Sequence, residues 1–499
     1  MIEKKRWLVS LAVIAAVVVS SAAIIYSKHV GPVNTSRSLS VTAISDGSGG
    51  VIVIWQKDSR IYGQRVSNSG EPQWGVEGLL IAECPPGSGL SLITDSLGGA
   101  IITWDDKSVR PKDRDDPAYF DPIRFYSQRI STNGEFLWKD AVIAPGDTGL
   151  YGDSFPIGIA DGTGGAIFVW NNYKTYFRAL HDDFLRLQKF APDGTRLWGD
   201  EGRLLVSSSP WRPITEEEKA AGIGGTINRS GPTYAGTHDI VNDGAGGCIV
   251  IWEEEEVERS SYGVYAQRLD NSGNPAWSQR VTVGIGRYQY NSLASDGSGG
   301  AVLALSYGDN RMALQQYIGS NGELLGKKYY NPAIITMSDG TGGSFSIRIE
   351  EDPRYGPPQE RRYIPWIQRL DASEQPLWEE KRVLPTDEQP YDNLKYLADG
   401  TGGVIITWCL QKESVAYSNI RMRKLDADGE LRWGEEGVPV FDIPDARYQK
   451  VVEILSDGSG GAIIVAVLGN NAIRGDMVYT QRLDKNGNCL WGNGIRIDR

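Results

Sequence analysis

The residues best suited to chemistry are few and scattered along the chain. There are three histidines, His29, His181 and His238, and His181 is followed directly by Asp182 and Asp183. An imidazole beside carboxylates is suited to metal binding or to acid–base catalysis. No further ligand stands at a matching spacing, so a histidine in a surface loop is the simpler interpretation of His181.

Acidic residues form two further patterns that could bind a cation. The run EEEE at residues 253–256 follows Trp252, and DADG (426–429) and DKNG (484–487) are similar to fragments of calcium-binding loops. Neither fragment has the downstream bidentate glutamate that such a loop needs. We therefore predict a solvated charge run that opens a loop at 253–256, and turn-forming roles for the two fragments. No catalytic residue, metal site or cofactor is predicted, and calcium is kept as the alternative.

Long irregular connections carry the residue types that anchor interfaces. Tyr, Trp and Arg are enriched at such surfaces, and the longest connections are predicted at 105–124, 171–185, 199–242 and 349–365. The candidate binding residues in them are Arg110, Tyr119, Tyr173, Tyr176, His181, Trp211, Tyr234, His238, Tyr355 and Arg361. Solvated insertions without a ligand are the competing interpretation, because loops tolerate extra length at little free-energy cost.

These connections lie between units that repeat eight times. Each unit begins with a DGxGG-like head (DSLGG in the second copy), whose aspartates are Asp46, Asp95, Asp161, Asp243, Asp296, Asp339, Asp399 and Asp457. A tryptophan follows nine residues later in five copies, while Leu305 and Arg348 take that position in the fifth and sixth. Self-similarity of this kind is the signature of a repeat architecture.

A second block follows each head at a variable distance. It contains Gln or Arg and then, ten residues later, Trp in seven copies; we place the fifth copy at Gln315 and Leu325. The first anchors are Gln64, Gln128, Gln188, Gln267, Gln315, Gln368, Arg423 and Gln481, and the second are Trp74, Trp138, Trp198, Trp277, Leu325, Trp378, Trp433 and Trp491.

Each block predicts a β-hairpin. Apolar or alternating runs flank a glycine-rich turn, and glycine, Asp and Asn supply the backbone conformations that such turns need. Two hairpins give four strands, A to D, per repeat. The sequence therefore predicts an all-β protein: an eight-bladed β-propeller of four-stranded antiparallel blades over residues 37–499, preceded by an N-terminal transmembrane or signal helix. Closure by a blade shared between the two chain ends is not required, although the tail at 494–499 could pair with the first blade.

The block YAQRLDNSGNPAW (265–277) resembles the C–D hairpin of quinoprotein-like (PQQ-like) repeats. In that family the hairpin Trp wedges between adjacent blades, and eight blades is the usual number. The whole DGxGG…W…QR…G…W pattern is also similar to the repeats of bacterial exported proteins. Catalytic quinoproteins have an adjacent cysteine pair and a Glu/Asn/Asp calcium site. Here Cys84, Cys248, Cys409 and Cys489 are far apart, so the resemblance is to non-catalytic members, such as the propeller lipoprotein that assists outer-membrane protein assembly.

The N-terminus indicates export. Residues 7–26 form an uncharged run long enough to span a bilayer, and Lys4, Lys5 and Arg6 precede it. We interpret residues 1–28 as a signal-anchor, or alternatively a cleaved signal peptide, and 29–36 as a short linker. The propeller is then expected in the cell envelope outside the cytoplasm, or secreted if the segment is cleaved. Residues 29–499 carry a net charge near −15, which disfavours nucleic acid as a partner.

The two constant hairpins predict which end of the propeller carries function. A–B and C–D turns lie at one end of a blade, so the variable B–C and D–A connections lie at the other, which we call the loop face. We expect a binding or assembly scaffold for a protein or glycan at the loop face. The alternative is an extracytoplasmic enzyme, either a glycoside hydrolase or lyase or a divergent quinoprotein, with its site at the axial channel of the same face.

Overall fold

Every regular element of the described chain is a β-strand. The computed structural model describes residues 40–498 apart from 85–87, 107–123, 140–154, 178–179, 209–210, 214–226, 230–232, 257–260, 287, 308–311, 331–333, 342, 352–362, 372–374, 385–393, 412–417, 444–445, 447 and 471–472. Within these bounds, no helix is long and apolar enough to cross a membrane. The predicted N-terminal helix lies outside them.

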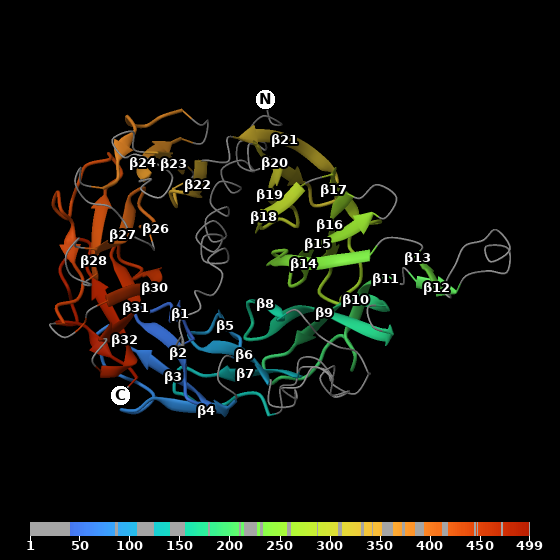
Figure 1. Ribbon diagram of the computed structural model, residues 1–499, viewed down its shortest axis with the longest axis horizontal. Helices are drawn as coiled ribbons and strands as arrows, with labels where there is room; N and C mark the ends of the chain where they lie inside the picture. The colour runs from blue at the N-terminus through green and yellow to red at the C-terminus, as the bar shows by residue number, and fades with distance from the viewer. Residues whose placement is uncertain are drawn as a thin grey trace.

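Eight antiparallel sheets, numbered here as blades 1 to 8 in chain order, stand around a common centre (Figure 1). Blades 1 to 4 are formed by β1 (Val41–Ser45), β2 (Val51–Lys57), β3 (Arg60–Val66) and β4 (Leu79–Glu83); β5 (Leu90–Thr94), β6 (Ala100–Asp106) and β7 (Arg124–Ile130); β8 (Ile157–Ala160), β9 (Ala166–Phe177), β10 (Leu180–Phe190) and β11 (Arg203–Ser208); and β14 (Thr233–Asn242), β15 (Cys248–Glu256), β16 (Ser261–Leu269) and β17 (Val281–Gly286).

Blades 5 to 8 are formed by β18 (Tyr288–Ser295), β19 (Ala301–Tyr307), β20 (Met312–Ile318) and β21 (Leu324–Tyr330); β22 (Ile334–Ser338), β23 (Ser344–Glu351), β24 (Tyr363–Leu370) and β25 (Lys381–Arg382); β26 (Lys395–Ala398), β27 (Val404–Gln411), β28 (Ser418–Leu425) and β29 (Val438–Pro439); and β30 (Tyr448–Ser456), β31 (Ala462–Asn470), β32 (Ile473–Leu483) and β33 (Ile495–Arg496). Seven blades have four strands in chain order, and blade 2 has three described strands.

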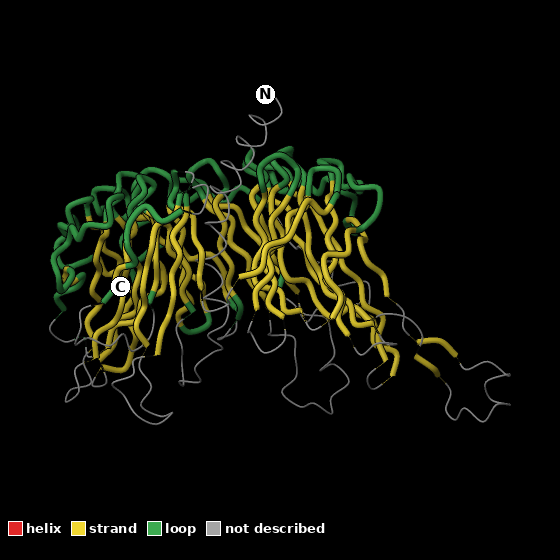
Figure 2. Tube along the Cα trace, turned by 90° about the horizontal axis from the view of Figure 1, so that it is seen from above, coloured by secondary structure: helices red, strands yellow, loops and turns green. Residues whose placement is uncertain are grey.

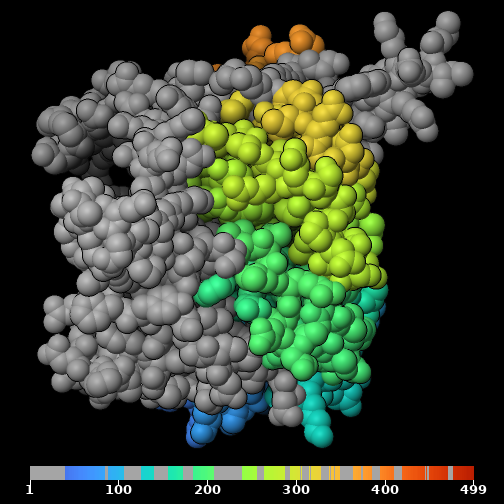
Figure 3. All heavy atoms as spheres, turned by 90° about the vertical axis from the view of Figure 1, so that its right-hand side faces the viewer, coloured from blue at the N-terminus to red at the C-terminus, as the bar shows by residue number. Residues whose placement is uncertain are grey.

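This arrangement confirms the all-β prediction and matches the architecture of a β-propeller. The first strand of each blade lies nearest the centre (Figure 1), and the neighbours β1 and β5, and β14 and β18, are in contact there. The fourth strand lies outermost. Figure 3 shows the outer wall, where blades 3 to 5 follow one another in chain order.

The core lies between blades. Seven apolar clusters each join two neighbouring blades, as where Val53 and Trp55 of blade 1 pack with Val465 and Val478 of blade 8. Because both faces of a blade are covered, a middle strand such as β2 is apolar on both sides, and Val51–Trp55 is fully buried.

The structure corrects four predictions about loops and strand pairing. The predicted loop at 171–185 is instead a β-hairpin, because β9 and β10 continue to Phe177 and from Leu180. The acidic run at 253–256 lies inside β15. The predicted connection at 199–242 contains the blade strands β11 and β14 and a small separate hairpin, β12 (Trp211–Pro213) with β13 (Ile227–Arg229). Finally, the C-terminal β33 pairs with β32 of its own blade, not with blade 1.

Candidate functional site

One face of the ring carries the repeated turns, which Figure 2 shows as a continuous band of loops. In every A–B turn the head aspartate accepts two backbone N–H bonds at Oδ1, from the second and fourth residues after it, at 2.7–2.9 Å. In blade 1 these donors are Ser48 and Gly50. The motif therefore encodes a turn that its own carboxylate holds together, as predicted.

The second carboxylate oxygen, Oδ2, meets a cation from strand C of the same blade. The pairs are Asp46–Arg65, Asp95–Arg129, Asp161–Lys189, Asp243–Arg268, Asp339–Arg369, Asp399–Lys424 and Asp457–Arg482, at 2.6–3.5 Å. Sequence reasoning missed this pair. Its signal was the basic residue that directly follows the Gln or Arg anchor in seven of eight copies.

The environment of five of these carboxyls favours the ionised form. Burial acts to raise the pKa of Asp46, Asp161, Asp339, Asp399 and Asp457, but the amide bonds and the cation outweigh burial and hold each pKa below its ordinary value. These five aspartates are therefore structural ion-pair partners.

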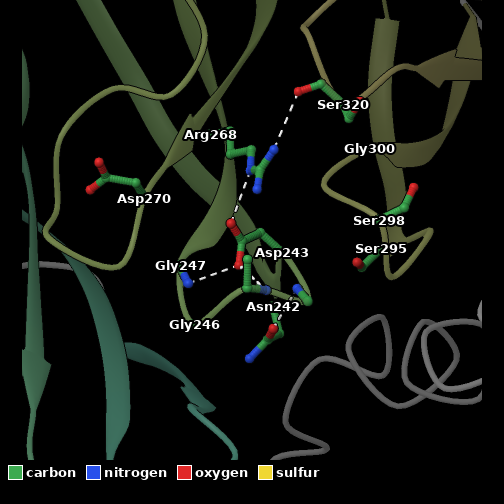
Figure 4. A network of polar contacts seen from close by, with 12 residues as sticks. Asn242, Asp243, Gly246, Gly247, Arg268, Asp270, Ser295, Ser298, Gly300 and Ser320 are labelled. Atoms are coloured by element: carbon green, nitrogen blue, oxygen red, sulfur yellow. Dashed lines mark hydrogen bonds and ion pairs between the residues drawn. The ribbon is translucent and has the colours of Figure 1, made fainter.

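The same cation reaches into the next blade. Arg268 binds Asp243 and also donates to the carbonyl of Ser320 in the C–D turn of blade 5, as Figure 4 shows. The Trp277 indole donates to that carbonyl too, at 2.9 Å. Shared carbonyls recur at Asn68, Thr132 and Pro192, and the indoles of Trp198 and Trp433 make the equivalent bond to Asn271 and Lys485.

The glycine two residues after that carbonyl packs against the same indole. A Cβ atom at Gly322 would lie 2.9 Å from Cγ of Trp277, and seven C–D turns show this close approach. We call the set of aspartate, cation, tryptophan and facing turn glycine the inter-blade clip. The prediction that these tryptophans serve blade packing is thus supported in seven blades.

Blade 5 corrects one predicted anchor. Strand register places Leu303 opposite Gln316, as Val250 stands opposite Gln267 in blade 4. Gln316 donates to the carbonyl of Gly326 at 2.6 Å. The anchor is therefore Gln316 and not Gln315, and the tryptophan position is taken by Gly326 and not Leu325.

Blade 6 explains a tryptophan that lies outside the repeat pattern. Arg348 occupies the B-strand tryptophan position and stands opposite Trp366 in strand register, where blades 3 and 7 have Trp opposite Arg. Arg348 also makes two hydrogen bonds to Glu380, at 3.1 and 2.6 Å. Aromatic and cation have exchanged strands, so Trp366 is a packing residue.

The acidic run in β15 is only partly a solvated charge. Glu254 is buried, accepts a hydrogen bond from the Trp252 indole at 2.8 Å and pairs with Arg280 at 2.5 Å, while Arg280 lies over the Tyr265 ring. Glu254 therefore holds the end of blade 4, and the prediction of a solvated loop is wrong for this residue.

The two calcium-like fragments are turns. Asp426 and Asp484 each accept two backbone N–H bonds at Oδ1. Across the described part of the chain, no three His, Cys, Asp or Glu side chains are grouped so that they could hold a metal ion. All four cysteines are free thiols, and three are buried.

The candidate binding residues are only partly placed. Tyr173 (β9), His181 (β10), Tyr234 and His238 (β14) lie on strands of blades 3 and 4, and register sets Tyr173 opposite Asp183 and Tyr234 opposite Glu254. Tyr176 also lies on β9, and Trp211 lies on β12 opposite Arg229. The remaining candidates, Arg110, Tyr119, Tyr355 and Arg361, lie outside the described residues.

Comparisons with known proteins give no family. No family model matches the chain, and no curated protein matches it. Among solved structures, it is similar to dipeptidyl peptidase 4 of Porphyromonas gingivalis, with a TM-score of 0.47, 10% identity and coverage of 92% of this chain and 60% of that one.

Prolyl oligopeptidase B of Galerina marginata gives a TM-score of 0.43 at 11% identity, covering 91% of this chain and 58% of that one. The endo-arabinase of Bacteroides thetaiotaomicron gives 0.26 at 13% identity, covering 60% of this chain and 95% of that one. The chain thus spans about 60% of the length of the two peptidases. Likeness at this level carries no functional argument, and the quinoprotein-like resemblance stays a prediction.

Proposed function

We propose that this protein is a binding or assembly scaffold that holds a protein or glycan at the loop face. The observation that carries the proposal is the use of charge on the turn face. Seven of the eight head aspartates are paired with strand-C cations, and these cations also donate to the next blade. Because these groups already hold the fold together, recognition is better served by the connections at the opposite end of the blades.

The β12–β13 hairpin is the proposed contact arm. It forms a two-stranded sheet of its own and projects beyond the ring of blades (Figure 1). Trp211 and Arg229 stand opposite each other on it, and Trp and Arg are the residue types that most often anchor interfaces. A hairpin that projects in this way suits contact with a partner better than it suits blade packing.

Membrane anchoring through residues 7–26 is part of the same proposal. The apolar run and the preceding Lys4, Lys5 and Arg6 support a cytoplasmic N-terminus with the propeller outside. Protease treatment of intact cells or spheroplasts tests this arrangement. The propeller is expected to be digested while a cytoplasmic control protein survives, and protection of the propeller would contradict it.

The binding proposal is tested by affinity capture with the full chain, cross-linking and mass spectrometry, together with a glycan array. One variant lacks residues 209–232, which removes the arm but keeps the blade strands β11 and β14. A second is Trp211→Ala, and Phe136→Ala serves as the matched control because Phe136 is an exposed aromatic on the turn face. Both arm variants should weaken capture by about tenfold or more, with the control unchanged. Equal capture by all four proteins would exclude the arm as the binding site.

A further inference from the structure

The inter-blade clip is incomplete at one junction of the ring. Between blades 5 and 6, Tyr317 takes the cation position and Gly326 takes the tryptophan position. In the sequence of the corresponding turn of blade 6, DASEQ, Glu374 stands where the other seven copies have glycine, and residues 372–374 lie outside the described residues. By the spacing of the repeat, all three changes belong to the junction between blades 5 and 6.

The described side chains of blade 5 show the consequence. Gly326 is exposed, and a Cβ atom there would meet nothing within 4 Å, whereas the indoles of Trp74 and Trp277 at the same position are 6% and 2% exposed. The neighbouring Leu324 and Leu325 are 44% and 52% exposed. The part of the junction that tryptophan fills elsewhere therefore stands open to solvent.

Asp296 at the head of blade 5 is also set differently. It keeps its two amide bonds, but it is half-buried where the other seven head aspartates are buried. Tyr317, the residue at the cation position, carries no positive charge, and burial raises the pKa of its hydroxyl.

The junction between blades 8 and 1 makes an informative contrast. The two ends of the ring meet there, so no connection along the chain joins these blades directly. The clip is nevertheless complete: Arg482 and Trp491 donate to the carbonyl of Asn68 at 3.0 and 3.1 Å, and Gly70 faces the Trp491 indole. Lys57 adds a bond to the carbonyl of Asp498 at 3.0 Å.

We propose that the ring opens at the junction between blades 5 and 6, and not where its ends meet. At an intact junction such as that between blades 4 and 5, the cation and the indole both donate to the next blade and a turn glycine packs on the indole, so the blades separate only when these contacts break together. The junction without them loses much less on separation, while the chain between blades 5 and 6 keeps the two halves tethered. The inference concerns the motion of the ring and does not depend on the proposed binding function.

Native-state hydrogen exchange on the full chain tests the proposal directly. The amides of β21 and β22 should exchange at least about tenfold faster than those of β17 and β18, the equivalent strands at the intact junction between blades 4 and 5. The amides of β33 and β1 should exchange as slowly as those of the intact junction. Equal rates at the three junctions, or fastest exchange at β33 and β1, would overturn the proposal.

Two variants separate the clip from other local effects. Trp277→Gly removes the tryptophan from an intact junction and should raise exchange in β17 and β18 toward the rates of β21 and β22. Tyr317→Arg combined with Glu374→Gly restores two missing groups and should slow exchange in β21 and β22 by about tenfold or more. If the first variant fails to fold, the second decides alone. Unchanged exchange in the restored variant would contradict the assigned cause of opening.

Discussion

At the scale of single residues, each head aspartate divides its work between two oxygens. Oδ1 accepts the two turn amides, and Oδ2 binds the strand-C cation, as in Asp243 with Ala245, Gly247 and Arg268. The first task shapes the hairpin, and the second ties that hairpin to the next blade through the carbonyl of Ser320. A carboxylate is needed for the second task but not for the first.

Replacing Asp243 and Asp296 by asparagine should separate these two tasks. Asn keeps an oxygen for the amides, but Asp243→Asn leaves Arg268 without its carboxylate, and we expect the free energy of unfolding to fall by about 3 kcal/mol. Asp296→Asn breaks no ion pair with the strand-C position, which is Tyr317, so we expect a loss of about 1 kcal/mol or less.

Urea unfolding of both variants, followed by circular dichroism, gives the comparison. Arg268→Gln provides a check from the other side of the pair and should resemble Asp243→Asn. Equal losses for Asp243→Asn and Asp296→Asn would show that the ion pair adds nothing beyond the turn.

At the scale of elements, the C–D hairpin belongs to two blades at once. Its turn glycine has a positive φ and also leaves room for the indole of the preceding blade. Gly487 has φ +86°, and a Cβ atom there would lie 2.8 Å from Cγ of Trp433. Gly458, in the A–B turn of the same blade, has φ +74° and nothing within 4 Å of an added Cβ atom.

Alanine at Gly487 and at Gly458 should therefore have different effects. Both substitutions strain the backbone by about 1–2 kcal/mol, but only Gly487→Ala also pushes against Trp433. We expect Gly487→Ala to lose about 2 kcal/mol more than Gly458→Ala, since overpacking of this kind costs about 1–3 kcal/mol. Urea midpoints of the two variants measure the difference, and matching midpoints would refute the steric role of the glycine.

The sequence predicted the A–B hairpins well because their determinants are local. DGxGG and the Gly-to-Trp spacing are turn and packing signals contained within a few residues, and the corresponding A–B turns are as predicted. The sequence misplaced strand D, which in blade 4 is β17 beyond Trp277, while the predicted segment up to Trp277 forms only the bridge Leu269–Pro275.

The predicted anchor was wrong in blade 5, where Gln315 and Gln316 are adjacent and no Trp marks the end of the block. Strand register and the spacing of four from Gly322 to Gly326 both select Gln316. The prediction that Glu254 is solvated was wrong for a different reason: its partner Arg280 lies 26 residues further along the chain, beyond any local pattern.

The candidate binding residues were harder to predict than the fold. Their positions depend on connections that do not repeat, so one copy carries no information about another. Tyr173 and His181 were expected in a loop but lie on extended strands, because β9 and β10 pair beyond the repeat. Trp366, by contrast, could have been assigned from sequence once Arg348 was recognised as its cross-strand partner.

At the scale of the whole molecule, the turn face carries a series of buried ion pairs around the ring. Seven ion pairs follow one another around the ring. For five of their aspartates the folded-state pKa is lowered: burial works against this, but turn amides, hydroxyls and the basic residue outweigh it. The unfolded chain then binds protons more readily than the folded ring as the solution becomes acidic.

Stability should therefore be lost on the acid side. Each of the five carboxyls contributes stability that is present above the ordinary aspartate pKa of 3.8 and is lost as pH falls through its lower folded value. Asp476 acts in the opposite sense, because burial and the nearby Asp498 raise its pKa, so its protonation on acidification stabilises the fold.

One group cannot offset five, and we expect the urea midpoint to hold nearly steady from pH 7 to about 5 and to fall steeply below about pH 4. Circular dichroism across that range measures the curve, and Asp457→Asn should make the fall shallower because it removes one of the five carboxyls. A midpoint that rises on acidification would mean that the ring of carboxylates repels more than it binds.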